Sequence, residues 1–204
     1  MPPPPAADVP DPVGTEGGDD HDVGDEEFDD SATVNLSTVL RRRAEEQAKA
    51  GPPPLQAVFC PAAHPNPAHA ETCRQCGAPI VDRSIRSIAR PVLGRLRFDD
   101  GAVVELRQPV LIGRNPPSDA VLGSELAIPV RLPDREALIS RSHVAVHLDG
   151  WHVKLVDQDS KNFTYITIPG QPKQRLVAGT PTTVPIGTVV VLGEAASFTF
   201  EPPA

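Results

Sequence analysis

The chain of 204 residues is poor in aromatic side chains, which make up 4% of it, with a single Trp and a single Tyr. Long apolar runs are missing as well, because none approaches the roughly 18 residues of a membrane-spanning helix. The opening residues, MPPPPAADVP, lack the basic start and the apolar centre of a signal peptide. The sequence therefore predicts a soluble, cytoplasmic protein with no membrane insertion.

Basic residues are absent from the first 30 positions, which hold 11 Asp and Glu and no Lys or Arg. The net charge of the chain is −8, so the remaining residues carry +3. Residues 1–34 are rich in Pro, Gly and Asp and have too few apolar groups to offset the entropy lost on ordering. We expect a disordered acidic tail, followed by a short helix and a Pro-rich linker over residues 35–57.

Only three cysteines occur, and all lie between Cys60 and Cys76. An odd number in a reducing compartment argues against a disulfide framework and favours metal binding. The candidate ligands follow the spacing Cys-x3-His-x8-Cys-x2-Cys, which suits tetrahedral Zn²⁺: Cys60, His64, Cys73 and Cys76. His69 is a rival fourth ligand, and free cysteines beside incidental histidines are the alternative interpretation.

This spacing resembles a small zinc ribbon or zinc knuckle over residues 58–81, followed by a linker over residues 82–91. Four protein ligands leave no open position for water, so the resemblance implies a structural rather than a catalytic zinc ion. Zinc would then be the main source of folding free energy for so small a segment. A nucleic-acid-binding regulator that uses this segment and Arg41 to Arg43 is an alternative, but aromatic residues are not interleaved with the nearby arginines.

From residue 92 to residue 202, short alternating runs are broken by turn residues. Two pairs of runs are typical of hairpins, one around the turn Asp99-Asp100-Gly101 and one around Gly150. In the second pair, each run carries its apolar side chains on one face: Val144, Val146 and Leu148, then Trp151, Val153 and Leu155. About ten short strands without a convincing helix predict an all-β fold, an antiparallel β-sandwich or barrel.

Three motifs occur in this region: LIGR at residues 111–114, ISRSH at residues 139–143 and DQDSKNFT at residues 157–164. With the strands, they resemble the forkhead-associated (FHA) domain, a β-sandwich whose loops at one end bind phosphothreonine peptides. The resemblance covers residues 92–202. It implies five phosphothreonine-binding residues and three loop-shaping positions: Arg114, Ser140, Arg141, Lys161 and Asn162 for binding, and Gly113, His143 and Phe163 for shape.

A phosphothreonine carries about −1.5 to −2 charges and several acceptor oxygens. A site that binds it therefore needs a guanidinium group together with hydroxyl and amide donors. The resemblance implies that Arg114 and Ser140 contact the phosphate, that Arg141 and Lys161 assist, and that Asn162 holds the peptide backbone. The ordinary alternatives are solvated surface arginines, a loop hydroxyl and a turn asparagine.

Phe163 departs from the FHA pattern, which has Asn-Gly where this chain has Asn162-Phe163. Glycine adopts a positive φ without steric cost, whereas a bulky residue there is an outlier. Either the turn relaxes to φ < 0 at Phe163, or it stores strain of roughly 1 to 3 kcal/mol. A degenerate FHA scaffold that binds partners without phosphate is therefore a second interpretation.

The segment 115–139 is an insertion that carries Arg131 and Arg135 and could either select residues beside the phosphothreonine or cover the site. In the tail, DDSATVNL places Thr33 after acidic residues, which predicts phosphorylation of Thr33, with Thr38 as a weaker candidate. The phosphorylated tail could bind the Arg114 and Ser140 site as a self-regulating switch.

The most coherent interpretation is a non-catalytic signalling adaptor, because nothing in the sequence assembles a nucleophile with a base or a metal with an open position. Its predicted partners are phosphothreonine-containing proteins and a Ser/Thr kinase, with no small-molecule substrate. Nucleic-acid binding has little support.

Overall fold

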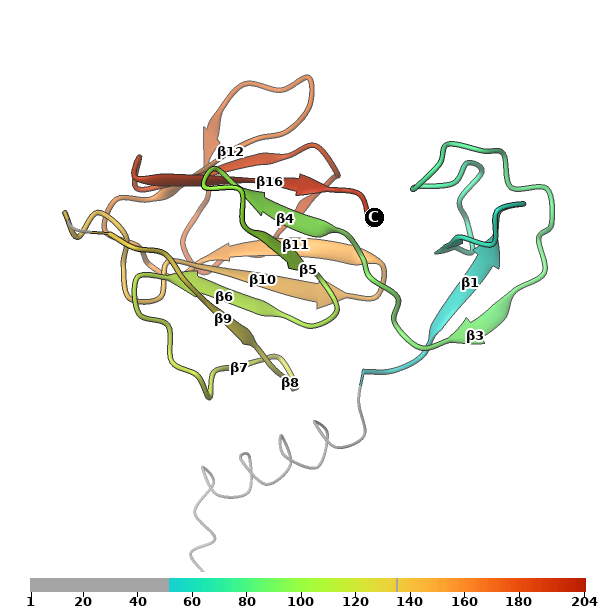
Figure 1. Cartoon of the computed structure of the whole chain (residues 1–204), viewed down its shortest axis with the longest axis horizontal. Helices are drawn as coiled ribbons and strands as arrows, with labels where there is room; N and C mark the ends of the chain where they lie inside the picture. Colours follow the sequence, from blue (N-terminus) through green and yellow to red (C-terminus); the bar gives the residue numbers. More distant parts are fainter. Residues whose placement is uncertain (1–51, 135) are drawn as a thin grey trace, which may run out of the picture. The chain divides into compact units, whose positions relative to one another are not determined.

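The structure, a computed structural model, describes residues 52–134 and 136–204 (Figure 1). Every regular element in this part of the chain is a β-strand, and none of the described residues forms a helix that could cross a membrane. The predicted acidic tail with Thr33 and Thr38, the predicted helix with Arg41 to Arg43, and Arg135 lie outside the described residues. The all-β prediction is confirmed.

Two sheets form the larger body, which is a β-sandwich (Figure 1). The six-stranded sheet has the order β13 (Gln174–Arg175), β12 (Thr164–Thr167), β15 (Val189–Leu192), β16 (Ala196–Glu201), β4 (Arg95–Phe98) and β5 (Val103–Glu105). The five-stranded sheet has the order β14 (Thr182–Val184), β11 (His152–Asp157), β10 (Val144–Asp149), β6 (Val110–Gly113) and β9 (Ile128–Arg131).

The core lies between these two sheets and follows from the alternation of apolar residues along the strands. One cluster contains Val144, Val146 and Leu148 of β10 together with Phe198 and Phe200 of β16. Burial of each such side chain stabilises the fold by about 1.5 to 3 kcal/mol. The inward faces predicted for the two runs around Gly150 are confirmed, since the β11 valine and leucine are buried and Trp151 packs against the same cluster.

Both predicted hairpins form, as β4 with β5 and β10 with β11. Their turns contain Gly101 at φ 88° and Gly150 at φ 56°, a backbone region that favours glycine. One pairing differs from the antiparallel prediction, because β6 and β9 run parallel. The cause is the connection between them, residues 114–127, which returns the chain to the starting end of β6 before β9 begins.

The insertion packs on the outer face of the five-stranded sheet. Its hairpin, β7 (Val121–Leu122) with β8 (Glu125–Leu126), places Leu122 against a second buried cluster of Leu111, Ala127, Ala145 and Val156. Leu111 and Ala145 alternate along their strands with residues of the main core, so they face the opposite side of the sheet. This half of the insertion therefore adds a covering layer rather than a cap over the loops.

A smaller sheet precedes the sandwich and has the order β2 (Pro65–Pro67), β1 (Leu55–Phe59) and β3 (Arg86–Ile88). Its core is small and includes two of the cysteines: Val58, Cys60, Cys73 and Ile80. The sheet extends beyond the predicted segment 58–81 into both predicted linkers, because Leu55 pairs with Ile88 and Ala57 with Arg86. The residues of β3 are exposed or half-buried and pair through their backbone, so they give no apolar periodicity in the sequence.

Candidate functional site

Three loops meet at one end of the sandwich: the loop after β6, the loop before β10 and the loop between β11 and β12. The backbone N–H of Arg114 donates to the carbonyl oxygen of Ser140 across 3.0 Å. The backbone N–H of Lys161 donates to Ser140 Oγ across 3.2 Å. The structure thus brings Arg114, Ser140 and Lys161 together, although they are far apart in the sequence.

Gly113 permits the close approach of two of these loops. A Cβ atom at this position would lie 2.0 Å from the carbonyl oxygen of Arg141 and 2.9 Å from that of Ser140. Both atoms belong to the backbone, so a side chain could be accommodated only if the loops moved apart. Gly113 is therefore needed for space.

His143 joins the loop of Ser140 to the turn of Phe163. Its ring is fully buried, its Nδ1 accepts the backbone N–H of Ser140 across 3.1 Å, and its Nε2 lies 3.1 Å from the carbonyl oxygen of Phe163. An imidazole that accepts at Nδ1 and donates at Nε2 is neutral. Burial lowers the pKa of His143 below its ordinary value of 6.5, which is consistent with this neutral form and outweighs the opposing effect of the Phe163 carbonyl.

Phe163 has a left-handed backbone, at φ 61°, which is the region that glycine favours. The turn has therefore not relaxed to φ < 0, and the strained alternative describes this loop. The carbonyl oxygen of Phe163 accepts from His143 and also from the backbone N–H of Gly193 across 3.2 Å. These two bonds hold a conformation that costs on the order of 1 kcal/mol or more for a residue with a Cβ.

The other end of this turn is anchored by Asp157, to which the sequence analysis gave no role. Its buried carboxylate accepts from the backbone N–H of Ser160 at 2.9 Å, from Ser160 Oγ at 2.6 Å and from Thr164 Oγ1 at 2.5 Å. The signal was present in the motif, because an Asp three residues before a Ser is typical of a side chain that stabilises a turn.

The side-chain amide of Asn162 makes one hydrogen bond within the described part of the protein. Its Nδ2 donates to the carbonyl oxygen of Leu138 across 2.9 Å, which fixes the side chain against the loop before β10. Within the described residues its Oδ1 has no partner, and one N–H of the amide is also left. The fixed amide can still offer one donor and one acceptor.

Three cationic side chains project from these loops: those of Arg114, Arg141 and Lys161, all exposed. None of them pairs with a carboxylate within residues 52–134 and 136–204. A hollow of about 570 Å³ lies beside Ser140 and Arg141 and is bounded on its other side by Asn115, Pro116 and Pro117.

A second hollow of about 510 Å³ adjoins Arg114 and includes Arg131 and Asp134. Arg131 donates through Nε to the carbonyl oxygen of Arg114 across 3.1 Å and through Nη2 to Asn115 Oδ1. The second half of the insertion therefore supports the loop that carries Arg114, and its Arg131 lies beside that residue.

The Cys and His residues of the small sheet converge as the spacing predicts. His64 Nδ1 lies 3.5 Å from Cys60 Sγ and 3.7 Å from Cys73 Sγ, while Cys76 Sγ lies 3.9 Å from Cys60 Sγ. All four ligand atoms are within 4.8 Å of one another. Ligands of a tetrahedral zinc ion lie roughly 3.5 Å apart, so the cluster fits one such ion. His69 is exposed and lies outside the cluster.

Backbone and side-chain groups around this cluster favour thiolate at Cys73. Burial raises the pKa of Cys73, but hydrogen bonds from the backbone of Cys76 and Gln75 and from Asn66 outweigh it and lower the pKa to about 6. The buried Asn66 also donates to the carbonyl oxygen of His64 and accepts the backbone N–H of Arg74, each at 2.8 Å. Asn66 thereby holds the backbone of His64 close to that of Arg74, between Cys73 and Cys76. The spacing of the cysteines in the sequence did not reveal this role.

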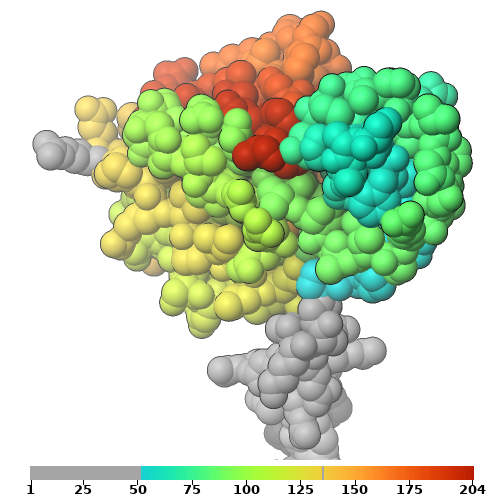
Figure 2. Space-filling model, turned by 45° about the vertical axis from the view of Figure 1, so that its right-hand side comes forward, coloured from blue at the N-terminus to red at the C-terminus, as the bar shows by residue number. Residues whose placement is uncertain are grey.

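Residues next to the cysteines also contact the sandwich. The guanidinium of Arg74 lies over the ring of Trp151, 5.7 Å from its centroid, and donates to the carbonyl oxygen of Leu93. Trp151 Nε1 donates to the carbonyl oxygen of Gln56 in β1 across 3.0 Å. Gln75 Nε2 also donates to the carbonyl oxygen of Ala204, at the C-terminal end that is coloured red in Figure 2.

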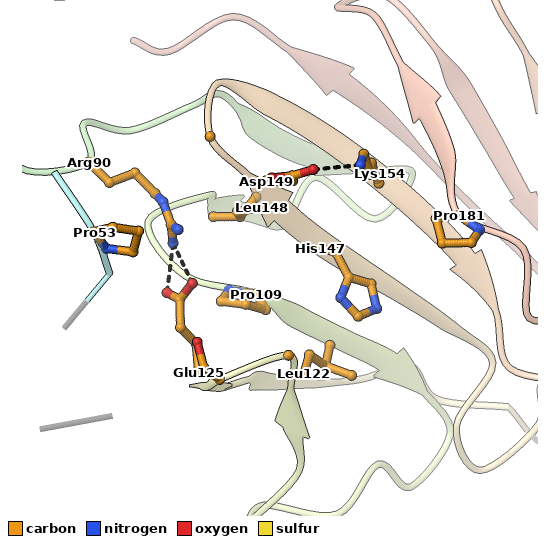
Figure 3. Close-up of a pocket in the computed structure, with 13 residues that line it drawn as sticks. Pro53, Arg90, Pro109, Leu122, Glu125, His147, Leu148, Asp149, Lys154 and Pro181 are labelled. Carbon is orange, nitrogen blue, oxygen red and sulfur yellow. Dashed lines mark hydrogen bonds and ion pairs between the residues drawn. The ribbon is translucent and has the colours of Figure 1, made fainter. Parts of the chain in front are cut away.

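A separate cavity of about 390 Å³ lies at the opposite end of β10 (Figure 3). Its buried Arg90 donates through Nη1 to both carboxylate oxygens of Glu125, at 2.8 and 2.6 Å, and Lys154 pairs with Asp149 at 2.5 Å. Both cationic side chains thus already pair with acids, although Arg90 Nε is buried and has no hydrogen-bond partner among the described residues. This cavity ties the segment before β4 to the β7–β8 hairpin and lies away from the three loops.

Comparison with known families agrees with this geometry. Residues 110–193 match the family model of the FHA domain. The match places an FHA domain at these residues, and the sandwich extends it on both sides, since β4, β5 and the end of β16 belong to the same six-stranded sheet. The comparison with curated proteins found no match.

Solved structures of FHA domains are similar to about half of the chain. The FhaA FHA domain, complexed with the intracellular domain of Rv3910, is 24% identical and covers 52% of this chain and 98% of its own, with a TM-score of 0.37. The FHA domain of human APLF, in complex with an XRCC1 bisphosphopeptide, is 18% identical and covers 54% and 99%, with a TM-score of 0.41. The N-terminal FHA domain of S. cerevisiae Rad53p, with a phosphothreonine peptide, is 14% identical and covers 55% and 94%, with a TM-score of 0.40.

Proposed function

We propose that the three loops bind phosphothreonine in a partner protein and that the chain acts as a non-catalytic adaptor in the cytoplasm. One observation carries this proposal: the loops that meet at Ser140 present the cationic side chains of Arg114, Arg141 and Lys161, which pair with no carboxylate in residues 52–134 and 136–204. Such a set matches a ligand with about −1.5 to −2 charges and several acceptor oxygens. The FHA match at residues 110–193 supports it.

Each residue has a distinct part in this proposal. Ser140 Oγ accepts from the backbone of Lys161, so its own hydrogen is left to donate to a phosphate oxygen. Arg114 supplies a guanidinium that can bind two phosphate oxygens, and Arg141 and Lys161 add charge. Asn162, fixed by Leu138, offers its remaining N–H and its Oδ1 to the peptide backbone.

The turn geometry supports phosphate-dependent binding over a degenerate scaffold. Phe163 adopts the φ that glycine would have, and His143 and Gly193 hold its carbonyl oxygen. The substitution therefore leaves Asn162 beside Leu138 rather than displacing it. A scaffold that had lost the need for a peptide-binding turn would have no reason to keep a strained one.

We also propose that Cys60, His64, Cys73 and Cys76 hold one structural Zn²⁺. The donor set, three thiols and one imidazole within 4.8 Å, supports this, as do the N–H groups directed at Cys73 Sγ. The ion would cross-link a core of only four buried residues, which is too small to fold by burial alone.

We also propose, from its sequence, that the N-terminal tail is phosphorylated at Thr33 and binds the three loops. Thr33 follows acidic residues that suit many threonine kinases, so a Ser/Thr kinase would create a phosphothreonine ligand within the chain. A ligand in the same chain can reach an effective concentration near millimolar, so even a modest affinity would act as a switch. A Thr33→Ala protein treated with kinase should lose any chemical-shift change that treatment produces in the loops of the wild-type protein.

Chemical-shift mapping tests the main proposal. A phosphothreonine peptide library is titrated into ¹⁵N-labelled protein, with the unphosphorylated peptides as controls. We expect shifts at Arg114, Ser140 and residues 161–163 from phosphorylated peptides only. Equal shifts from both sets, or shifts confined to other parts of the sandwich, would refute phosphothreonine binding at these loops.

A further inference from the structure

Two aromatic side chains continue from the Asn162 turn along the outer face of the six-stranded sheet. Thr164 and Ile166 are buried, so Phe163 and Tyr165, which alternate with them, face outward. Phe163 is 43% exposed. The neighbouring strand β15 extends this face with Val191, which pairs with Tyr165.

A cation covers each of these rings. The guanidinium of Arg175 lies 4.4 Å from the ring centroid of Phe163, and Lys173 Nζ lies 4.6 Å from that of Tyr165. Both cations come from the exposed segment around β13, the edge strand of the sheet, and neither pairs with a carboxylate in the described part of the chain. We name Phe163, Tyr165, Lys173 and Arg175 the aromatic–cation patch.

Stability of the fold does not account for Phe163. Its left-handed backbone costs on the order of 1 kcal/mol or more, and glycine would avoid that cost. An exposed cation–π contact returns only about 0.5 to 1 kcal/mol, and a ring that is nearly half exposed gains little from burial. The outlier therefore points to a function of the ring at the surface.

The position of the patch indicates what it contacts. Phe163 is adjacent to Asn162, which is held against Leu138, so a peptide bound by Asn162 would lie next to the patch. The ring lies against the Arg175 guanidinium, whose N–H groups have no partner among the described residues and can donate to a carboxylate. Lys173 provides a second charge beside it.

We propose that the aromatic–cation patch selects phosphothreonine segments that have acidic residues beside the phosphothreonine. This inference rests on the proposed function, because it assigns one flank of the same ligand. Arg175 and Lys173 pair with the carboxylates, while Phe163 and Tyr165 hold the two cations in place and contact the intervening peptide backbone.

The test uses the zinc-loaded chain of 204 residues and peptides of a neutral background with one central phosphothreonine. One peptide carries two Asp residues on the N-terminal side of the phosphothreonine and a second carries them on the C-terminal side. In the control peptides, Asn replaces each Asp. Every peptide is also made in an unphosphorylated form. We expect the acidic phosphopeptide on one of the two sides to bind roughly threefold to tenfold more tightly than its Asn counterpart, as two exposed ion pairs would give. High salt should reduce this ratio.

Variants locate the effect. In a Lys173→Gln, Arg175→Gln protein the ratio should fall to about one, while binding of the neutral phosphopeptide should be unchanged. Arg107→Gln removes an exposed cation next to the opposite edge strand, β5, and should leave the ratio intact. Phe163→Gly should lower the ratio without lowering thermal stability, which a purely structural role for the ring would not produce.

Two outcomes separate the possible failures. Phosphate-dependent binding with equal affinity for acidic and neutral flanks, or a ratio that survives the double substitution, would overturn this inference and leave the proposed function standing. Binding that ignores the phosphate would overturn the proposed function itself.

Discussion

His143 Nε2 donates to the carbonyl oxygen of Phe163 across 3.1 Å, and this bond joins two of the three loops, beside the bonds of Lys161 to Ser140 and of Asn162 to Leu138. The other ring nitrogen of His143 accepts from the backbone of Ser140, so one neutral imidazole sets the distance between the Ser140 loop and the Asn162 turn. The bond also explains how a phenylalanine can occupy a glycine position. Its carbonyl oxygen is fixed from outside the turn, so φ is set by tertiary contacts rather than by the preference of the residue.

Replacing Phe163 by glycine should stabilise the fold slightly and weaken ligand selection. The left-handed strain disappears, but the stacked contact with Arg175 is lost and the unfolded chain gains freedom. We expect a change in unfolding free energy between zero and about 1 kcal/mol in the stabilising direction, measured by denaturant unfolding. Loss of more than about 1 kcal/mol would show that the ring is structural.

Acidification should destabilise the domain through His143. Its folded pKa lies below 6.5, so the unfolded state binds more protons between that pKa and 6.5. The contribution is fully present above about pH 6.5 and is lost as pH falls toward the folded pKa. Denaturant unfolding from pH 5 to pH 8 should give a shallower pH slope for His143→Gln than for the wild type.

His147 provides the comparison for this experiment. Burial and the nearby Lys154 lower its pKa as well, so it contributes to stability with the same sign. His147→Gln should therefore also flatten the slope, but it should leave phosphopeptide binding unchanged because His147 lies toward the far end of β10 (Figure 3). An NMR titration in which His143 protonates at or above its ordinary pKa would contradict the neutral bridge.

Adding one methyl group at Gly113 should disrupt the site. Gly113→Ala places Cβ against the backbone of Arg141, so the Ser140 loop must move and both stability and phosphopeptide affinity should fall. We expect a loss of about 1 to 3 kcal/mol in unfolding free energy, as for other overpacked positions. Gly123→Ala is the matched control, because its Cβ meets nothing within 4 Å and only its φ of 67° opposes the change.

Removing zinc should unfold the small sheet and leave the sandwich intact. Chelation or Cys76→Ser should broaden or collapse the amide signals of residues 55–88, while those of β10 and β11 stay dispersed. The emission of Trp151, the single tryptophan, should shift because its Nε1 donates to Gln56 in β1. His69→Ala should change neither metal content nor emission, and a protein unaffected by chelation would contradict a structural metal.

Much of the fold could be predicted from local pattern. The runs around Gly150 alternate with period two, and their inward residues form the core as expected. The parallel pairing of β6 with β9 could not be predicted in this way, because it depends on the path of the intervening hairpin. The strand β3 also escaped detection, since its side chains do not alternate and only its backbone reveals the pairing with β1.

The candidate site shows the same division between local and long-range information. The motifs identified residues that the structure brings together, because each motif begins or ends at a strand that positions it. The φ of Phe163 could not be predicted from the sequence. It depends on hydrogen bonds from His143 and Gly193, which lie 20 and 30 positions away. Asn66 was missed because a buried side chain that anchors backbone groups has no periodic signature, whereas Asp157 lies in a recognised motif and only its buried contacts with Ser160 and Thr164 reveal its role.

The most direct measurement of the central claim is calorimetric titration of one phosphothreonine peptide into the wild type, Arg114→Ala and Arg107→Ala. Arg107 is an exposed arginine that contacts none of the three loops, so its loss controls for charge alone. We predict saturable binding by the wild type and Arg107→Ala, and affinity at least about tenfold lower for Arg114→Ala, as expected when a charged hydrogen-bonding partner is removed. Equal affinities for all three proteins, or equal binding of the unphosphorylated peptide, would contradict the account.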